Sequence, residues 1–427
     1  MSASTRELLR ELDTGLIQIK RRVYHAVRRP MRGRWAGRRE LLDKVAFIGV
    51  TGSCGKTTTK ELIAAALSTA GRGQRSMGSR NTIAQLLGLI AATKPEDDFA
   101  VMECAAYGPG TLDEPLRILR PRIGVVTNIG SDHWAAYGSL EGIAAEKGKL
   151  VSCLPAEGVA VLNADDPRVA AMRSLTKARV VTFGIEREAD LRAEHVSAAW
   201  PDRLRFELVF GGRRYPVSTK LCGTHWTPDV LAALAVATEM RVPLSTAIRA
   251  IEGVEPMRQR MRPEVHPDGI TFVYDDNKAP LWSVALALRF LRDARASRRI
   301  VVIGTISDRR KISDQKAKDD RAYRDVALEA LDSADHVVFV GELARHALRA
   351  QHPRAEMALR AFRTIREAAD HLRDYLRPGD LVLLKGSHRM DHLMRIPLSR
   401  LRPVRCWRGY CARQKSCDRC VFVGIPF

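Results

Sequence analysis

Short apolar runs of strand length alternate with helical patterns over most of this sequence. Four such runs precede residue 165: 45–50, 99–104, 122–130 and 158–163. Helical periodicity follows them, most clearly at 59–70 and 228–240. Strands that are apolar along their whole length are typical of a parallel sheet with helices on both faces. The alternation therefore predicts an α/β protein.

A second alternation begins near residue 263. It contains four further strand candidates: 270–276, 298–304, 335–341 and 380–386. A chain of 427 residues is too long for one ordinary core, so we expect two domains. The first, 45–260, should hold a mostly parallel sheet, and the second, 261–400, should be a smaller Rossmann-like α/β domain. Residues 178–222 differ, because short strands and turns there indicate an antiparallel insert.

The two ends of the chain fall outside these alternations. Residues 1–44 are basic and carry apolar residues at helical spacing: Leu8, Leu12, Leu16, Ile19 and Val23. This pattern predicts a helical N-terminal extension packed on the main body, with a membrane-surface or partner-binding helix as the alternative. Residues 401–427 form a cysteine-rich tail.

Charge and hydropathy limit the partners of the chain. The formal net charge is +21, which can attract nucleic acid, anionic lipid or anionic small molecules. Only 6% of residues are aromatic and no nucleic-acid-binding motif is present, so we expect no specific nucleic-acid partner. No apolar run reaches the roughly 18–20 residues that span a bilayer. Without a signal-peptide core either, the sequence predicts a cytoplasmic protein with no transmembrane segment.

The stretch GVTGSCGKTTT, residues 49–59, stands between a predicted strand and a predicted helix. That is the context of a phosphate-binding loop, although the first glycine of the G-x-x-x-x-G-K-[ST] pattern stands one place early. Gly52 and Gly55 allow close backbone approach to an anion, and Ser53 and Thr58 belong to the same loop. The stretch predicts a nucleotide site, with an ordinary strand–helix turn as the alternative.

Further polar residues stand where phosphate chemistry needs them. Lys56 can supply a charge for the outer phosphates and Thr57 a hydroxyl for Mg²⁺. Glu103 closes the strand 99–104, and His133 follows the strand 122–130, so both should lie at the edge of the sheet that carries the loop. Together these groups could hold Mg²⁺. The alternatives are a solvated strand end for Glu103 and a surface histidine for His133.

Several blocks of the sequence occur in the order found in the Mur ligase family, which the chain resembles from about residue 45 to 400. They are GVTGSCGKTTTKELIAAAL, TNIGSDHWAAYGSLEGIAAEKGKL, VLNADDP, GTHWTPDVLAALAVA and LKGSHRMDHLM. Members of this family are ATP-dependent amide ligases of peptidoglycan synthesis. The block GSLEGIAAEKGKL is especially like the branch that adds D-alanyl-D-alanine to a muramoyl tripeptide.

This resemblance implies a mechanism and roles for the loop. ATP would phosphorylate a substrate carboxylate, and an amine would attack the acyl phosphate to form an amide. Lys56 and the loop 52–55 match the groups that hold the phosphates. Thr57 and Glu103 match the ligands of one Mg²⁺, and His133 matches a ligand of a second Mg²⁺.

The resemblance also implies roles for residues outside the loop. Lys147 falls where the family often carries a carbamylated lysine, which acts as a carboxylate-like metal ligand; the alternative is a plain helix-surface lysine. Asn81 matches an asparagine near the transferred phosphate, and Asp275 an aspartate near the ribose.

The segment between the two predicted domains resembles the part of the family that contacts ribose or phosphate through an arginine. Arg260 is our choice for that residue, with Arg258 and Arg262 as close rivals. In the C-terminal domain, Lys385 and Ser387 lie where the family faces the amine substrate.

The sequence departs from the family pattern in three places. Only 44 residues precede the loop strand, so we expect the separate N-terminal domain that holds a UDP-sugar to be absent or reduced, with a partner protein as one replacement. Asp229 stands in place of an asparagine on the adenine side, and Lys278 in place of a histidine. The carboxylate substrate could then be a muramoyl peptide, a polyglutamate-type chain or another acidic metabolite, and the amine an amino acid or a dipeptide.

The tail contains four cysteines in the pattern C-x4-C-x5-C-x2-C: Cys406, Cys411, Cys417 and Cys420. Four thiolates at such spacing could close a tetrahedral Zn²⁺ site. An iron–sulfur cluster and free or redox-active thiols are the alternatives. The tail lies outside the family pattern.

Taken together, the sequence predicts an ATP- and Mg²⁺-dependent carboxylate–amine ligase with a P-loop-type central domain. The alternative is a regulatory or scaffold protein of the same fold that binds ATP without ligase turnover.

Overall fold

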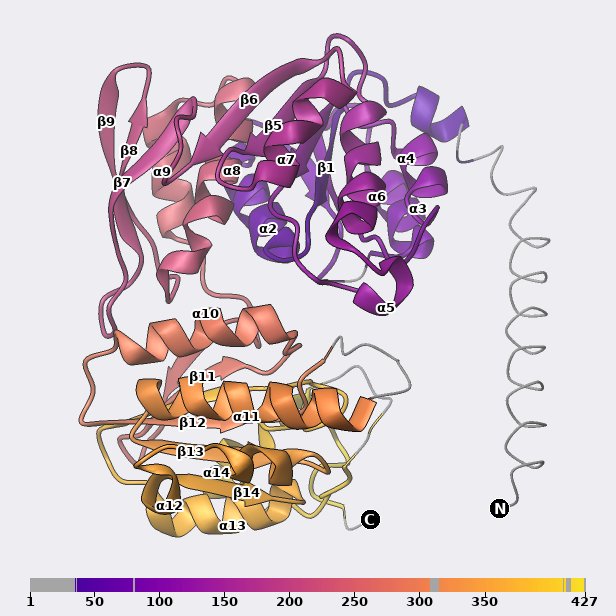
Figure 1. Ribbon diagram of the computed structural model, residues 1–427. Coiled ribbons are helices and arrows are strands. Elements are labelled where there is room, and N and C mark those ends of the chain that lie inside the picture. The colour runs from indigo at the N-terminus through magenta and orange to yellow at the C-terminus, as the bar shows by residue number, and fades with distance from the viewer. Residues whose placement is uncertain are drawn as a thin grey trace, which may run out of the picture.

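The computed structural model describes residues 35, 37–79, 81–307, 315–409, 411 and 416–425. These residues form two α/β units, one above the other in Figure 1. The two sheets, both mostly parallel, confirm the predicted α/β fold class. Most of the predicted N-terminal extension lies outside the described residues, and residues 37–40, just before the first strand, are helical.

The first unit contains a nine-stranded sheet with the order β2-β3-β1-β4-β5-β6-β7-β8-β9. Neighbours from β2 to β7 run parallel, and β7, β8 and β9 run antiparallel. The expected antiparallel insert is thus an extension of the same sheet. The strands are β1 Ala46–Thr51, β2 Gly73–Arg75, β3 Phe99–Glu103, β4 Ile123–Val126, β5 Val159–Asn163, β6 Arg179–Gly184, β7 Leu191–Ser197, β8 Arg205–Phe210 and β9 Arg213–Ser218.

Helices cover both faces of this sheet. Successive side chains of β1 point to opposite faces, so Ile48 packs in the core with α2 and α8, while Phe47 packs in the core with α3 and α4. The alanines of α8 between residues 232 and 237 are fully buried, and such small side chains let α8 approach α2 closely. The helices are α2 Lys56–Leu67, α3 Ile83–Ala92, α4 Asp113–Leu119, α5 Trp134–Tyr137, α6 Leu140–Ser152, α7 Pro167–Ala171, η1 Met172–Leu175, η2 Thr224–Trp226, α8 Thr227–Glu239 and α9 Leu244–Glu252.

The second unit contains a six-stranded sheet with the order β10-β11-β15-β12-β13-β14. Only β10 is antiparallel to its neighbour. The four predicted strands correspond to β11, β12, β13 and β15; the short strands β10 and β14 were not predicted. The strands are β10 Arg262–Val265, β11 Thr271–Asp275, β12 Arg298–Ile303, β13 His336–Val340, β14 Leu359–Phe362 and β15 Asp380–Lys385.

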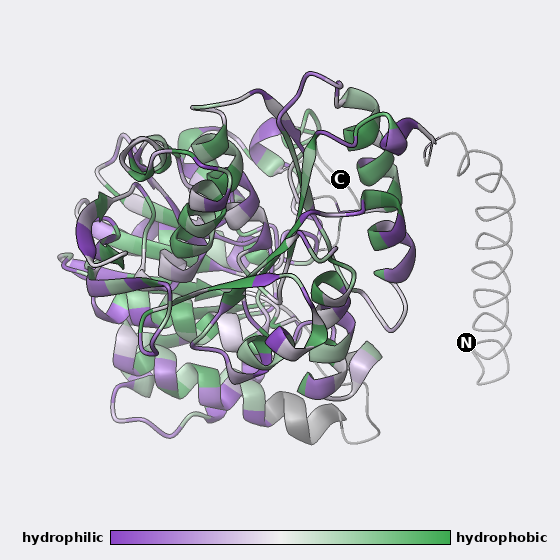
Figure 2. Cartoon of the chain, turned by 90° about the horizontal axis from the view of Figure 1, so that it is seen from above, coloured by the Kyte–Doolittle hydropathy of each residue, from purple (hydrophilic) through white to green (hydrophobic). Residues whose placement is uncertain are grey.

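Amphipathic helices flank the second sheet. The helices of the protein carry both hydrophilic and hydrophobic residues along their length (Figure 2), as expected for helices that bury one side. None of the described helices is long and apolar enough to cross a membrane. The helices of the second unit are α10 Leu281–Arg292, α11 Gln315–Ser333, η3 Ala344–Arg349, α12 Ala355–Ala358, α13 Ile365–Tyr375, α14 Arg395–Leu401 and η4 Cys417–Arg419.

The loops that follow β1 and β4 lie on the side of the first sheet that faces the second unit (Figure 1). Two contacts fix this arrangement. Arg260, on the linker between the sheets, donates from Nη2 to Thr57 Oγ1 at 3.3 Å. Trp282, at the start of α10, packs so closely on Gly130 that a Cβ there would lie 3.3 Å from its ring. The fold therefore brings the second unit against the carboxyl ends of the first sheet.

Phe47 offers a test of the two-sided core. Its ring is fully buried, and the Arg39 guanidinium lies 3.8 Å from the ring centroid. We expect Phe47→Ala to lower the free energy of unfolding by about 3–5 kcal/mol, because a cavity is left in a packed core. Leu41→Ala removes a side chain that is 72% exposed and should change it by less than about 0.5 kcal/mol. Urea titration measures both, and equal midpoints for the two variants would contradict the packing described above.

Candidate active site

The phosphate-loop candidate joins β1 to α2 in a turn that only glycine can form at two positions. Gly52 has φ +146° and Gly55 has φ +80°, both in the region that side chains disfavour. A Cβ at Gly52 would overlap the Thr127 hydroxyl, and one at Gly55 would overlap the Asp229 carboxyl. No side chain caps the N-terminus of α2. Its first backbone N–H groups are thus available to an anion.

Hydrogen bonds hold this loop against the segment that follows β4. The backbone N–H of Cys54 donates to Asn128 Oδ1 at 3.0 Å, and that of Ser53 donates to the Asn128 carbonyl at 2.9 Å. The Ser53 hydroxyl donates to the Gly130 carbonyl at 2.9 Å and accepts from the Gly130 N–H at 2.8 Å. The predicted loop residue Ser53 therefore fixes the loop. The buried residue Thr58 lies in the first turn of α2.

Thr57, Glu103 and Asn81 come together beside the loop. Thr57 Oγ1 donates to Glu103 Oε2 at 2.8 Å, and Asn81 Nδ2 donates to Glu103 Oε1 at 3.0 Å. The Tyr107 hydroxyl in turn donates to Asn81 Oδ1. Glu103 is only 2% exposed, so its carboxylate is held in one orientation at the end of β3. A hydroxyl and a carboxylate so placed are the oxygen ligands that Mg²⁺ prefers.

Two lysines converge on one backbone carbonyl. Lys56 Nζ donates to the Gly52 carbonyl at 2.7 Å, and Lys147 Nζ, from α6, donates to it at 2.9 Å. Lys147 is 1% exposed, which excludes the alternative of a plain surface lysine. Burial, and then the charge of Lys56, lowers the pKa of Lys147 to about 7. A substantial share of its amine is therefore neutral, and nucleophilic, near neutral pH.

Asp132 is a site residue that the sequence reasoning missed. It is 7% exposed, with Oδ2 3.8 Å from Lys56 Nζ and Oδ1 3.5 Å from His133 Nε2. Burial opposes its ionisation, but the charges of Lys56, His133 and Lys278 more than offset it and lower the pKa of Asp132. Its position directly before His133 was the available signal. Lys278 belongs to the second unit, so both units contribute charge here.

The structure separates the three arginines of the linker. Arg260 reaches Thr57. Burial raises the pKa of Asp229 in the first unit and of Asp275 in the second, and the charge of Arg260 offsets part of that rise at both carboxyls. Arg258 instead pairs with Asp418 of the tail, and Arg262 Nε lies 3.3 Å from Glu264 Oε1. Only Arg260 of the three donates to the phosphate loop among the described contacts.

On the side of the second unit, Asp275 and Lys385 form an ion pair at the ends of β11 and β15. Lys385 Nζ donates to Asp275 Oδ2 at 2.6 Å and to the Lys278 carbonyl at 3.1 Å. Burial raises the pKa of Asp275, and Lys385 offsets part of that effect. The backbone N–H of Ser387 donates to Asp391 Oδ2 at 2.7 Å, which fixes the following loop. Asp275 therefore lies near Arg260, whose charge acts on it.

The cysteine tail does not form the expected zinc site. Among the described residues, which include all four cysteines, no group of three or more His, Cys, Asp or Glu side chains is placed to hold a metal ion. The buried guanidinium of Arg395 instead donates to Cys406 Sγ at 3.7 Å, and burial raises the pKa of the Cys417 thiol. A cation and protonated thiols both oppose metal binding. The expectation of Zn²⁺ is therefore not supported.

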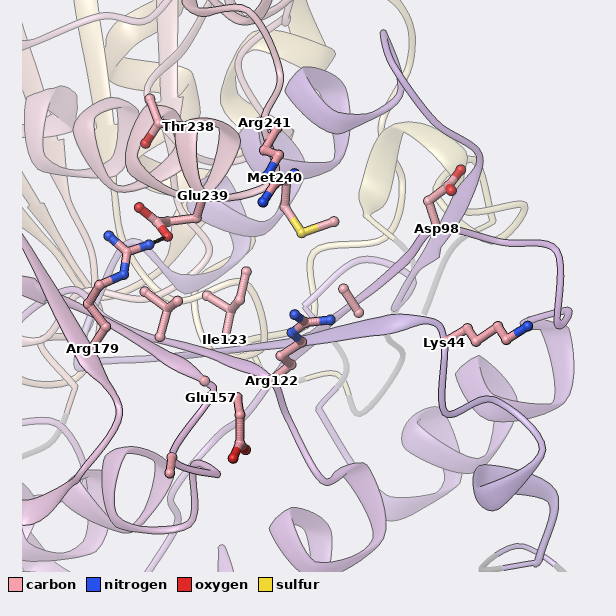
Figure 3. Close-up of a pocket in the computed structure, with 14 residues that line it drawn as sticks. Lys44, Asp98, Arg122, Ile123, Glu157, Arg179, Thr238, Glu239, Met240 and Arg241 are labelled. Carbon is pink, nitrogen blue, oxygen red and sulfur yellow. Dashed lines mark ion pairs between the residues drawn. The ribbon is translucent and has the colours of Figure 1, made fainter.

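A pocket of about 850 Å³ lies at the amino-terminal ends of the parallel strands of the first sheet, on the side away from the phosphate loop (Figure 3). Its lining includes the first residues of β1, β4, β5 and β6, together with the C-terminal end of α8. Arg179 pairs there with Glu239, and Arg122 lies nearby. The pocket contains none of the predicted site residues, and parallel sheets bind ligands beyond the other strand ends. It is therefore separate from the phosphate loop.

The fold and the loop define a class, that of nucleotide-binding α/β enzymes whose phosphate loop faces a second α/β unit. Residues 50–237 match the Mur ligase middle domain, and residues 258–388 match the Mur ligase, glutamate ligase domain. The chain therefore belongs to the Mur ligase family.

Named relatives agree with this assignment. The chain is 33% identical over 369 residues to the UDP-N-acetylmuramoyl-tripeptide–D-alanyl-D-alanine ligase of Mycobacterium tuberculosis, which covers 81% of this chain and 71% of the relative. It is 32% identical over 287 residues to the UDP-N-acetylmuramoyl-L-alanyl-D-glutamate–2,6-diaminopimelate ligase of Chlamydia caviae, covering 62% and 58%. The crystal structure of MurF from Acinetobacter baumannii superposes with a TM-score of 0.76 at 25% identity, covering 86% of this chain and 78% of that one.

These matches make the chain an ATP-dependent C–N ligase, a class that uses ATP and Mg²⁺ to form amide bonds. They favour the ligase over the regulatory or scaffold alternative. They give no support to a partner protein in place of an N-terminal domain.

Asp229 provides a pH-dependent test of the loop. It is 3% exposed, accepts from Thr59 Oγ1 at 2.8 Å, and has its pKa raised by burial to about 7. Between about pH 4 and pH 7 the folded state binds a proton that the unfolded state has lost, so stability declines across that window as the pH rises. Asp229→Asn removes this penalty. We expect the variant to melt above the parent at pH 8, with the difference vanishing near pH 4.

Differential scanning fluorimetry across that range measures the effect. Asp113→Asn, at a side chain that is 61% exposed, serves as the control for removing a carboxylate from the surface. If the melting temperatures of Asp229→Asn and the parent differed by the same amount at every pH, the raised pKa of Asp229 would be contradicted.

Proposed function

We propose that this chain joins a carboxylate substrate to an amine through an acyl phosphate, with ATP held by the loop 52–58 between the two units. The observation that carries this proposal is the turn at Gly52 and Gly55, next to the Thr57–Glu103 pair and with Arg260 donating to Thr57. The turn has no space for side chains, leaves the first N–H groups of α2 available, and stands among cations. An anionic ligand explains all three features.

The residues present fit a nucleotide with its metal. Thr57 and Glu103 offer oxygen ligands for one Mg²⁺, and His133, with Asp132 beside it, lies where a second ion could be held. Bound Mg²⁺ would neutralise phosphate charge during transfer. Lys56 and Arg260 both place a positive charge at the loop. Asn81 is oriented beside the loop by its hydrogen bonds with Glu103 and Tyr107. Positioning and charge are what phosphoryl transfer needs from a protein.

Lys147 would act in its carbamylated form. A neutral amine can add to CO₂, and burial next to Lys56 favours the neutral form. The nitrogen forms a bond to the carbon of CO₂ and releases a proton to solvent, so the product is a carbamate anion in place of a lysine cation. It would relieve the repulsion between the two lysines on the Gly52 carbonyl and add an oxygen ligand near the metal.

The substrates proposed here follow the named relatives. A muramoyl peptide is the carboxylate donor and an amino acid or dipeptide is the amine, as the names of the relatives print for those proteins. Lys278 and Arg260 contribute positive charge at the approach to the second unit, which suits a substrate that carries carboxylates. Asp275 would then face the ribose and Asp229 the adenine side.

The same proposal divides the chain into a central domain at 45–260 and a C-terminal domain at 261–400, followed by the tail 401–427. In support, the first sheet ends at β9 and the second begins at β10. The cytoplasmic location predicted from the sequence is kept as part of this proposal.

Phosphate release from ATP and Mg²⁺ tests the function directly. The panel pairs UDP-muramoyl-tripeptide with D-alanyl-D-alanine, and glutamyl chains with glutamate. We expect release that requires both members of one pair. Lys56→Ala should reduce it at least about a hundredfold, as when one preorganised charge-stabilising group is removed, with the melting temperature unchanged. Tight ATP binding without release in any pair would contradict these substrates, and normal turnover by Lys56→Ala would contradict the site.

Lys147 can be tested by chemical rescue. Lys147→Ala should lose turnover and regain part of it with formate or acetate, which replace the carbamate oxygens. Lys149→Ala is the matched control on the same helix, because Lys149 Nζ pairs with Asp113 and Glu146 away from the loop. It should retain turnover within about twofold. Absence of rescue, together with no carbamate signal after exposure to ¹³C-bicarbonate, would favour an unmodified lysine.

A further inference from the structure

The C-terminal tail folds back on the second unit and reaches the linker between the sheets. Beyond α14, the backbone N–H groups of Arg405 and Cys406 donate to the Val423 carbonyl at 2.9 and 3.1 Å, which brings the start of the tail next to Val423. Cys417 and Val423 are buried against Leu398 of α14. The match to the family domains ends at residue 388, so this part of the chain is an addition to them.

One carboxylate of the tail contacts the linker. Asp418, in the short helix η4, forms an ion pair with Arg258, and the Ser416 hydroxyl donates to its other oxygen. Arg402 Nη2 donates to the Asp418 carbonyl at 2.8 Å, which orients η4. Burial opposes ionisation of Asp418, but Ser416 and Arg258 lower its pKa below the usual range. The group is therefore charged at neutral pH.

The linker next to Arg258 has an unfavourable backbone. Gln259 has φ +60° and Met261 has φ +50°, so two non-glycine residues on either side of Arg260 occupy the left-handed region. This conformation is unfavourable for a residue with a side chain and persists only when surrounding contacts hold it. Met261 is 1% exposed, and Gln259 Nε2 lies 3.0 Å from His388 Nδ1. Three contacts therefore hold the turn: the burial of Met261, the contact of Gln259 with His388, and the ion pair of Arg258 with Asp418 of the tail.

This turn sets the direction of Arg260. Its guanidinium reaches Thr57 Oγ1, and its charge acts on Asp229 and Asp275. Arg258 and Arg260 are separated by one residue, so a change in the backbone at Arg258 moves Arg260 as well.

We propose that the tail is a positioning element for the nucleotide site, in which Asp418 acts through Arg258 to hold the strained turn that presents Arg260 to the phosphate loop. This inference rests on the proposed function, in that Arg260 is taken to contact the nucleotide. The tail thereby couples a segment outside the two family domains to ATP binding. Among the described residues, the polar contacts of Asp418 are with Arg258, Ser416 and Arg402, and none is with the phosphate loop.

The test measures binding of a fluorescent ATP analogue with Mg²⁺ to the full chain. Asp418→Asn keeps the size of the side chain and removes its charge. We expect the dissociation constant to rise at least about fivefold, the low end of coupling between distinct sites, with the melting temperature unchanged. Asp418→Arg combined with Arg258→Asp restores an ion pair of reversed sign and should return affinity to within about twofold of the parent.

Glu141→Gln provides a matched control. It removes an exposed ion pair, Glu141 Oε1 to Arg168 Nη2 at 2.9 Å, that is remote from the linker, and it should leave affinity unchanged. A merely structural role of Asp418 would lower the melting temperature of Asp418→Asn and leave its dissociation constant for the ATP analogue unchanged. That result would overturn the proposal.

Arg260→Ala separates this inference from the proposed function. Weakened binding by Arg260→Ala together with unchanged binding by Asp418→Asn overturns the role of the tail alone. Unchanged binding by Arg260→Ala overturns the nucleotide position on which both proposals stand. Weakened binding by both variants, with rescue by the reversed pair, supports the coupling.

Discussion

The tight turn between β1 and α2 is the constraint on which the rest of the site depends. Gly52 and Gly55 both adopt positive φ, and neighbouring side chains fill the space where Cβ atoms would stand. The Thr127 hydroxyl and the Asp229 carboxyl could not pack there against any other residue. The close packing holds the loop to β4 and α8 and leaves the first turn of α2 available to an anion. The positions of Thr57 and Lys56 follow from it, because both begin α2.

Charged side chains from both units gather around this turn. Lys56 and Lys147 share one carbonyl, Asp132 lies between Lys56 and His133, and Arg260 reaches in from the linker. The lysine and arginine side chains repel one another in the protein alone, and a bound phosphate would relieve this repulsion. The arrangement therefore favours binding of an anionic ligand. Since part of this charge comes from beyond the linker, the charge around the loop depends on the relative position of the two units. The tail, on the proposal made above, acts on ATP binding through this linker.

Local patterns in the sequence were sufficient for much of this architecture. The apolar runs became β1, β3, β4, β5, β11, β12, β13 and β15, because a buried strand has to be apolar along its whole length. The strands β2, β10 and β14 contain three or four residues each, too few for a periodic pattern, and sheet pairing alone defines them. The antiparallel segment was recognised, but its continuity with the parallel sheet was not, because that continuity is the pairing of β6 with β7 and a strand carries no local signal of its neighbour.

The sequence by itself determined the two α/β units, the glycine turn, and the presence of Thr57 and Glu103 at one edge of a parallel sheet. Burial periodicity and backbone sterics are local, so they can be read along the chain. Tertiary structure decided that Arg260 and not its neighbours reaches the loop, that Asp132 joins the site, and that Arg395 stands beside the cysteine thiols. These outcomes depend on where distant segments return in space, and a charged side chain carries no local signal of the partner it will meet.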